Sequence, residues 1–298
     1  MFKKLLATSI LATLSTGVMA DVKVYGKVNL SVQSSDEGTG SQTELKSNSS
    51  RIGFKGSEAL SNGLTIVYQY EMQVDVTDES GEKNLKSRNQ YVGIKGGFGE
   101  LLIGRNDTML KQSQGKFDVF SDYEGDLKKL WKGENRMGDS LSYKTPKLNG
   151  VQFGVSYIVD EDNDDAGYSL SAVYGDKALK NGNYYAAAAV DSDVKGFDVT
   201  RLTLGAKLSG VKVAAMLQNQ ENVATGVDAS GYLINGQYNV NGYNLKAQFQ
   251  TLEDDQGFSV GVDRKLGKNT KAYGFYTTFT PDQGEDEKYL AIGLEHKF

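Results

Sequence analysis

The chain has 298 residues, a formal net charge of −5 and no cysteine, so disulfides, thiol catalysis and thiolate metal sites are excluded. The modest acidic excess argues against a nucleic-acid-binding protein, which would normally carry a basic patch. Thirty-five glycines, seventeen tyrosines and only two prolines are typical of a protein built from short strands and tight turns.

Residues 1–20 have the order of a secretory signal peptide. Lys3 and Lys4 form a basic start, an apolar run follows them, and small residues end the segment at Ala20. The apolar run is too short to cross a bilayer as a helix. We therefore expect these residues to be removed on export, which leaves a mature chain 21–298 with 31 basic and 38 acidic residues and a charge of −7.

Alternation of apolar and polar residues begins directly after this leader. Val24, Val28 and Val32 share one face of an extended segment, while Lys23 and Tyr25 lie on the other, and a strict period of two predicts a strand. With Gly- and Asn-containing turns as boundaries, the rest of the chain divides in the same way into about sixteen strands of roughly ten residues. We expect the strands at residues 21–33, 44–56, 62–77, 85–97, 99–106, 136–146, 149–159, 166–175, 183–192, 198–208, 210–219, 229–240, 242–251, 256–266, 270–280 and 286–298.

Short turns alternate with longer acidic connections along this series. The short ones are 61–63, 148–150, 209–210 and 241–242, and the acidic ones include 160–165 and 283–287. An even number of strands, with short turns on one rim and longer loops on the other, indicates an all-β transmembrane antiparallel β-barrel rather than a soluble sandwich. The acidic run 160–165 lacks EF-hand spacing, so no specific metal site is predicted, and we expect its carboxylates to meet divalent cations among lipopolysaccharide headgroups.

The alternation is interrupted at length from about residue 107 to residue 135. Loops this long without regular structure are uncommon and usually functional. This one is rich in charged and aromatic residues. We expect it to fold into the lumen of the barrel and to narrow the pore.

Several short motifs resemble the Gram-negative general porins, and the resemblance extends over the whole chain. They are Tyr25-Gly26-Lys27, Ser50-Arg51-Ile52-Gly53-Phe54-Lys55-Gly56, Tyr91-Val92-Gly93-Ile94-Lys95, Gly104-Arg105 and the terminal Lys297-Phe298, whose aromatic end closes an alternating strand. The resemblance implies an outer-membrane channel for passive diffusion of ions and small hydrophilic solutes. It also implies a homotrimer in contact with outer-membrane lipid and lipopolysaccharide, without a cofactor.

The resemblance further assigns basic residues to the wall of a pore constriction. Lys27, Arg51 and Arg136 lie on the polar faces of their strands by alternation. Arg105 instead falls on the face of Ile103, so a bulge or a strand end is needed to turn it inward. We predict that these four residues form the basic side of the constriction.

The opposing acidic side is expected on the long loop. The acidic, Phe- and Gly-containing segment that carries Asp118, Asp122, Glu124 and Asp126 resembles the constriction loop of the family. It departs from the family by lacking a proline and by carrying lysines soon after the acids. The sign of the ion preference therefore stays open.

Other functions fit less well. The single histidine, His296, falls on the presumed lipid side, so no inward base is available for Ser–His catalysis, and an enzyme is not expected. Two alternatives remain open. One is a channel specific for a solute such as phosphate or an oligosaccharide, and the other is a structural or adhesive surface barrel.

Overall fold

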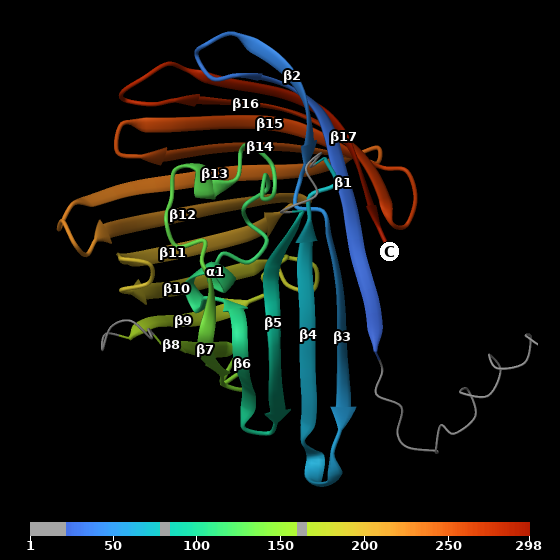
Figure 1. Cartoon of the computed structure of the whole chain (residues 1–298), viewed down its shortest axis with the longest axis vertical. Helices are drawn as coiled ribbons and strands as arrows, with labels where there is room; N and C mark the ends of the chain where they lie inside the picture. The colour runs from blue at the N-terminus through green and yellow to red at the C-terminus, as the bar shows by residue number, and fades with distance from the viewer. Residues whose placement is uncertain (1–21, 78–83, 160–165) are drawn as a thin grey trace, which may run out of the picture.

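The computed structural model describes residues 22–77, 84–159 and 166–298, and the predicted leader and the acidic run 160–165 lie outside them. Its strands follow one another around a single antiparallel sheet (Figure 1). None of the described helices is long and apolar enough to span a bilayer. The strands are β1 Lys23–Asp36, β2 Ser41–Ser47, β3 Arg51–Ala59, β4 Thr65–Val74, β5 Leu85–Gly96, β6 Gly99–Asp107, β7 Arg136–Lys144, β8 Val151–Ile158, β9 Gly167–Gly175, β10 Tyr184–Ser192, β11 Phe197–Leu208, β12 Val211–Asn222, β13 Asp228–Val240, β14 Tyr243–Leu252, β15 Asp255–Lys265, β16 Thr270–Thr280 and β17 Glu287–Lys297.

The sheet closes because β1 pairs with β17 as well as with β2 and β3. At this seam, the backbone N–H of Gly26 donates to the carbonyl of Phe298 over 3.0 Å, and the N–H of Phe298 donates to the carbonyl of Gly26 over 3.1 Å. Every described strand except β2, which pairs with β1 alone, has a hydrogen-bonded neighbour on both edges, and such closure is the condition for strands to cross hydrocarbon. The fold is therefore the predicted closed antiparallel barrel.

β2 and β3 are two parts of one barrel strand. Both pair with β1, and the three residues 48–50 lie opposite only residues 28 and 29, so the break is a β-bulge. The hydroxyl of Ser50 accepts a hydrogen bond from the N–H of Asn29 over 2.9 Å and satisfies the interrupted ladder. Counted in this way, the barrel has the sixteen strands that the sequence predicts.

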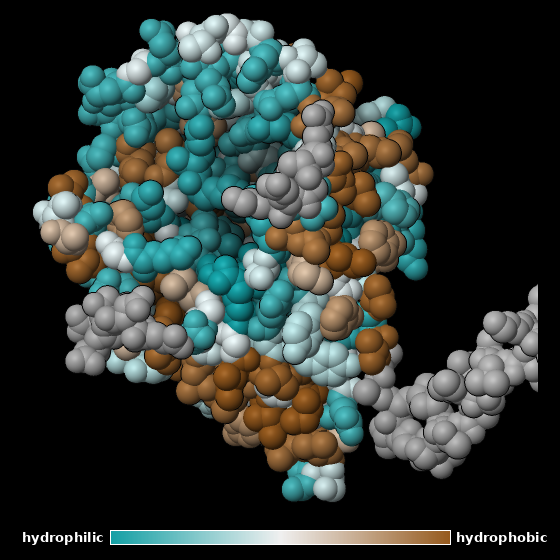
Figure 2. All heavy atoms as spheres, viewed as in Figure 1, coloured by the Kyte–Doolittle hydropathy of each residue, from teal (hydrophilic) through white to brown (hydrophobic). Residues whose placement is uncertain are grey.

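The two faces of each strand meet different surroundings. On β17, Leu290, Ile292 and Leu294 point outward and are about half exposed or more, while Tyr289 and Ala291 point inward and are buried. In Figure 2, hydrophobic residues gather over the outside of the lower strands and near β1 and β17, while hydrophilic residues line the hollow. An apolar exterior around a polar interior is the pattern of a barrel in a lipid bilayer.

The two rims also differ. The predicted short turns all lie on the rim where β1 begins and β17 ends, called here the short-turn rim. In the two-residue connections 209–210 and 241–242, both residues have positive φ (48° and 89°, and 50° and 81°), which is the type I′ geometry that matches strand twist. The opposite rim, called here the loop rim, carries the 28-residue connection between β6 and β7.

Candidate functional site

Residues 108–135 connect β6 to β7 and lie inside the ring of strands (Figure 1). The segment, called here the inner loop, contains the short helix α1 Met109–Ser113 and the 3-10 turn Leu127–Lys129. The Thr108 hydroxyl accepts a hydrogen bond from the N–H of Lys111 and caps α1, and the Asp126 carboxylate caps the 3-10 turn in the same way. These local caps let a segment without long regular structure hold one shape.

Apolar side chains attach the inner loop to one half of the wall. Three buried clusters form, and in each of them loop residues pack against inward positions of β10–β17 that are apolar instead of polar. The aromatic rings are close: the centroids of Tyr123 and Tyr273 are 4.8 Å apart, and those of Phe117 and Tyr185 are 4.9 Å apart. The buried loop residues in these clusters are Leu110, Phe117, Phe120, Tyr123, Leu127 and Trp131. Contact with the loop thus removes the apolar patch on the inner wall from water, which stabilises the position of the loop.

A buried arginine holds the far end of the inner loop. The Arg201 side chain on β11 is fully buried, and its Nη1 lies 2.7 Å from the Glu134 carboxylate. Its Nη2 donates to the carbonyl of Lys132 over 3.1 Å, and its Nε donates to Gln218 over 2.7 Å. A buried guanidinium is tolerated only with such full pairing, so these contacts make the loop and the wall one unit.

Asp122 is the centre of the charge cluster between the loop and the wall. Its Oδ2 lies 2.7 Å from Lys27 Nζ on β1 and 2.7 Å from Arg51 Nη2 on β3. Asp122 has φ of 74°, in the left-handed region that non-glycine residues rarely adopt, and strain of this kind is often held at functional sites. The charges of Lys27 and Arg51 outweigh burial and hold the pKa of Asp122 well below its usual range. Asp122 therefore stays ionised at neutral pH.

The other acidic residues of the prediction have separate places. Asp118 is buried, accepts hydrogen bonds from the N–H groups of Phe120 and Leu127 at 3.1 Å each, and does not line the cavity that remains between the inner loop and the wall, called here the lumen cavity. Burial and the nearby Asp126 carboxylate raise the pKa of Asp118. The Glu124 carboxylate lies 3.5 Å from Lys46 Nζ, outside that cavity. Asp126 does line it.

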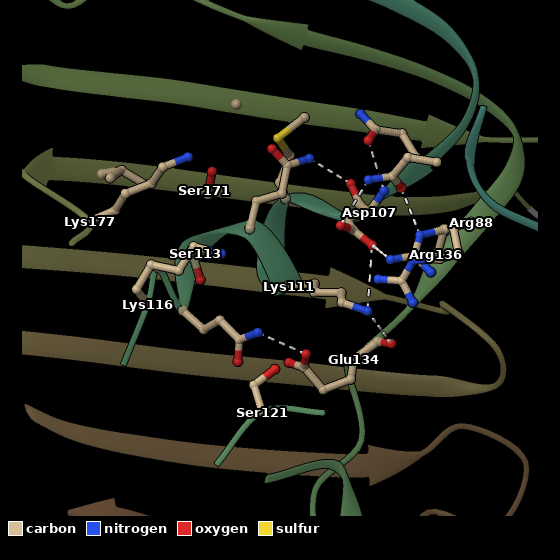
Figure 3. Close-up of a pocket in the computed structure, with 18 of the residues that line it drawn as sticks. Arg88, Asp107, Lys111, Ser113, Lys116, Ser121, Glu134, Arg136, Ser171 and Lys177 are labelled. Carbon is tan, nitrogen blue, oxygen red and sulfur yellow. Dashed lines mark hydrogen bonds and ion pairs between the residues drawn. The ribbon is translucent and has the colours of Figure 1, made fainter. Parts of the chain in front are cut away.

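A cavity of about 660 Å³ remains between the inner loop and β3–β9, and Figure 3 shows part of its lining. On the wall, Arg136 Nη2 lies 2.8 Å from Asp107 Oδ1, and Arg88 Nε lies 2.5 Å from Glu71 Oε1. Its charged lining residues are Arg51, Arg88, Lys111, Lys116, Lys128, Arg136, Lys144 and Lys177, with Glu71, Glu100, Asp107, Asp122, Asp126 and Glu134. The lining thus carries eight cations and six anions.

Bulges decide which arginines reach this cavity. The register between β4 and β5 shifts between Tyr70 and Met72, opposite Arg88, and Arg88 lines the cavity although the sequence analysis did not select it. The register between β6 and β7 also shifts, at Arg105, where a bulge was expected. Arg105 nevertheless does not line the cavity, and it forms no ion pair with the residues that the structure describes. Arg51, Arg88 and Arg136 therefore line the cavity, whereas Lys27 lies outside its lining and reaches the inner loop through its ion pair with Asp122.

Comparison with known proteins gives one consistent result. A family model described as "Gram-negative porin" matches residues 7–284. The major outer membrane protein P.IB of Neisseria meningitidis serogroup B is 28% identical over 339 residues, which cover 99% of this chain and 100% of that protein. Among solved structures, the anion-selective porin from Comamonas acidovorans aligns with a TM-score of 0.79 at 22% identity, covering 94% of this chain and 100% of that one. The Salmonella typhi OmpF complex with daunomycin aligns with a TM-score of 0.72 at 16% identity, covering 93% and 97%.

Proposed function

Because this chain belongs to the family of Gram-negative porins, we propose that it selects among permeating solutes where the inner loop meets the basic wall. The protein is an outer-membrane channel for passive diffusion of ions and small hydrophilic solutes. Diffusing solutes are sorted at the narrowest section, because charged side chains act most strongly there. The proposed constriction consists of Asp122 and Asp126 on the loop and Lys27, Arg51, Arg88 and Arg136 on the wall.

The observation that carries this proposal is the pairing of Asp122 with two cations, each at 2.7 Å. Lys27 and Arg51 also lie 3.6 Å from Glu295 and 3.7 Å from Glu71, so these contacts balance the charge of the cluster, and the positive excess comes from the cavity lining with its eight cations and six anions. Asp107 is likewise shared by Arg136 at 2.8 Å and Lys111 at 3.5 Å. We infer a mild preference for anions.

Unpaired lysines along the cavity point to the same sign. Lys116, Lys144 and Lys177 line the cavity and have no ion pair within residues 22–77, 84–159 and 166–298. Glu100, the carboxylate next to Lys144 along this lining, pairs instead with Lys95 at 3.6 Å. The excess of two positive charges in the lining is thus exposed to the permeating solution.

The proposal also covers the oligomeric state, the export of the chain and the absence of catalysis. We infer a homotrimer, supported by outward apolar side chains such as Leu45, Ile52 and Phe54 and by the resemblance to general porins. Export by residues 1–20 and contact of the loop rim with lipopolysaccharide belong to the same proposal. We further propose that the chain catalyses no reaction: His296 is exposed on the wall and bonded to the Thr270 hydroxyl at 2.8 Å, away from the carboxylates of the cavity.

The test is the reversal potential of the purified protein in a planar bilayer under a KCl gradient. We expect discrete conductance steps. We also expect the sign of the reversal potential to show that chloride permeates more readily than potassium. Replacing Lys27 and Arg51 together by Gln should move that potential toward potassium preference. Conductance steps with potassium preference in the unaltered protein would contradict the proposed constriction while leaving the channel itself intact.

A further inference from the structure

Lysines surround the mouth of the barrel at the short-turn rim. They occur at every hairpin of this rim and at the seam, with the exception of the β13–β14 hairpin. They are Lys23 and Lys297 at the seam, Lys55 on β3, Lys95 on β5, Lys144 on β7, Lys177 and Lys180 in the β9–β10 turn, Lys207 and Lys212 on β11 and β12, and Lys265 and Lys271 on β15 and β16. These eleven residues are called the lysine ring.

The strand members of the lysine ring face the lumen. On β11, Lys207 has the same parity as the buried, inward Val199 and Arg201, and on β16, Lys271 has the parity of inward Tyr273. Direct contacts agree, because Lys55 Nζ lies 5.2 Å from the ring centroid of Tyr25, whose hydroxyl donates to Glu71 in the lumen. The ring therefore charges the aqueous mouth and not the lipid-facing wall.

Like charges stand directly opposite each other in this ring. The strand registers pair Lys23 with Lys55, Lys207 with Lys212, and Lys265 with Lys271. Directly opposed residues of antiparallel strands have Cβ atoms about 4.5–5.5 Å apart, and like charges at that spacing destabilise the sheet. Three such pairs at one mouth are difficult to explain by barrel stability and indicate a function for concentrated positive charge.

The acids of this rim do not neutralise the lysine ring. The Asp176 carboxylate accepts the backbone N–H groups of residues 178, 180 and 181 at 2.6–2.9 Å. Glu295 is shared by Lys27, Lys271 and Lys297 at 3.2–3.8 Å. The remaining ring lysines, apart from Lys95 with Glu100, form no ion pair with any described residue. Most of the ring is uncompensated.

The loop rim has the opposite charge. Apart from the inner loop, its described connections contain eight acids and a single lysine, Lys195. The acids are Glu37, Asp75, Asp193, Glu253, Asp254, Asp282, Glu285 and Asp286. The modest net charge of the chain thus conceals a channel that is basic at one mouth and acidic at the other.

We propose that the lysine ring gathers small anions at the short-turn mouth and makes the channel conduct asymmetrically. This inference rests on the channel function and not on the constriction. Each mouth concentrates its own counter-ions, anions at the ring and cations at the loop rim. A voltage that is positive on the loop side drives both kinds of ion inward from the mouth where they are enriched, so carriers accumulate and conductance rises. The reverse voltage depletes them.

The test is the current–voltage relation of single channels in symmetric KCl. At 0.1 M salt, where the screening length is about 10 Å, we expect the current at loop-side-positive voltage to exceed the reverse current by roughly twofold. At 1 M, where the length is about 3 Å, the two should become equal. The orientation of the channel in the bilayer is determined with the variant Asn241→Cys, which has a single thiol at the short-turn rim. A membrane-impermeant thiol reagent should reduce the current only when it is added to the side that this rim faces.

Two matched variants separate the ring from other causes. Lys55→Gln, Lys207→Gln and Lys265→Gln together remove one member of each opposed lysine pair, and they should bring the two currents at 0.1 M close to equality. The control replaces Lys86, Lys195 and Lys288 near the loop rim by Gln and should preserve or increase the asymmetry. The proposal is overturned if the ring variant keeps the asymmetry, if the control loses as much, or if the unaltered channel is symmetric at 0.1 M. A shift of the reversal potential by the constriction variants stays a separate result.

Discussion

Replacement of Asp122 by Asn should increase the anion preference of the channel, because it leaves Lys27 and Arg51 without the carboxylate that both contact at 2.7 Å. The side chain keeps its shape and loses one negative charge at the proposed constriction. Both cations retain a second acidic neighbour, Glu295 at 3.6 Å from Lys27 and Glu71 at 3.7 Å from Arg51. We therefore expect the variant to fold and the barrel to stay closed.

The magnitude follows from the interaction of one charge with a passing ion. At about 8 Å in water, a unit charge contributes roughly 0.5 kcal/mol, which changes anion and cation partition by about twofold in opposite directions. The two partition changes multiply in the chloride-to-potassium permeability ratio, and screening at 0.1 M salt reduces their product. The ratio should therefore rise by about three- to fivefold. The reversal potential in a KCl gradient measures this ratio directly.

Glu124→Gln is the matched control, since it neutralises an acid of the same loop whose carboxylate contacts Lys46 at 3.5 Å and lies outside the lumen cavity. Its reversal potential should stay close to that of the unaltered protein. If Asp122→Asn leaves the permeability ratio unchanged while conductance steps persist, or if Glu124→Gln shifts the ratio equally, the assignment of Asp122 to the constriction is wrong.

Three further predictions use other parts of the site. Arg88→Gln should reduce the anion preference by removing a lining cation, whereas Arg105→Gln should leave the reversal potential unchanged, and equal shifts would contradict the placement of these two arginines. Arg201→Met should lower the free energy of unfolding in detergent by about 3–5 kcal/mol because it removes the ion pair with Glu134 and leaves buried Gln218 and the carbonyl of Lys132 without their donor, while Arg264→Met on the outer face should cost less than about 1 kcal/mol. The difference in reversal potential between the unaltered protein and Asp122→Asn should be constant from neutral pH down through the usual carboxylate range, because the pKa of Asp122 is depressed. The charge of Asp122 is present above the depressed pKa and is lost only as the pH falls through it, so a loss of this difference near pH 4–5 would contradict the pairing.

The fold could be predicted from the sequence because lipid imposes a simple rule on every strand. Residues facing hydrocarbon must be apolar, so the period of two survives along β1 and β17 and the turn residues mark the boundaries to within a few positions. The break between β2 and β3 was not predicted, because residues 44–56 were expected to form one strand. A bulge of one residue at 48–50 changes the parity of a strand without leaving a Pro or Gly signal.

The site was harder to predict from the sequence, because a bulge changes which face of a strand a residue lies on. Arg88 has the parity of an outward residue if the alternation is continued from Tyr91, and only the register shift beside Glu71 brings it to the cavity. The sequence alone does not distinguish the roles of Asp118 and Asp122, because both are aspartates in the same charged loop. Their roles differ because backbone N–H groups surround the first and two cations surround the second.

The contact between Gly26 and Phe298 has a consequence for how the molecule comes into being. A side chain on Gly26 would collide with the ring of Phe298, where an added Cβ would lie 2.5 Å from the ring, so the last residue of the chain docks onto a space left near its beginning. The seam therefore forms only after β17 has been synthesised, and the loss of loop entropy on joining β1 to β17 falls late in assembly. A chain shortened by its final strand would present two unsatisfied edges to the acyl chains, each exposed backbone group costing several kcal/mol. A partial cylinder is thus not a stable resident of the membrane, and we expect the closed ring of strands to be inserted cooperatively.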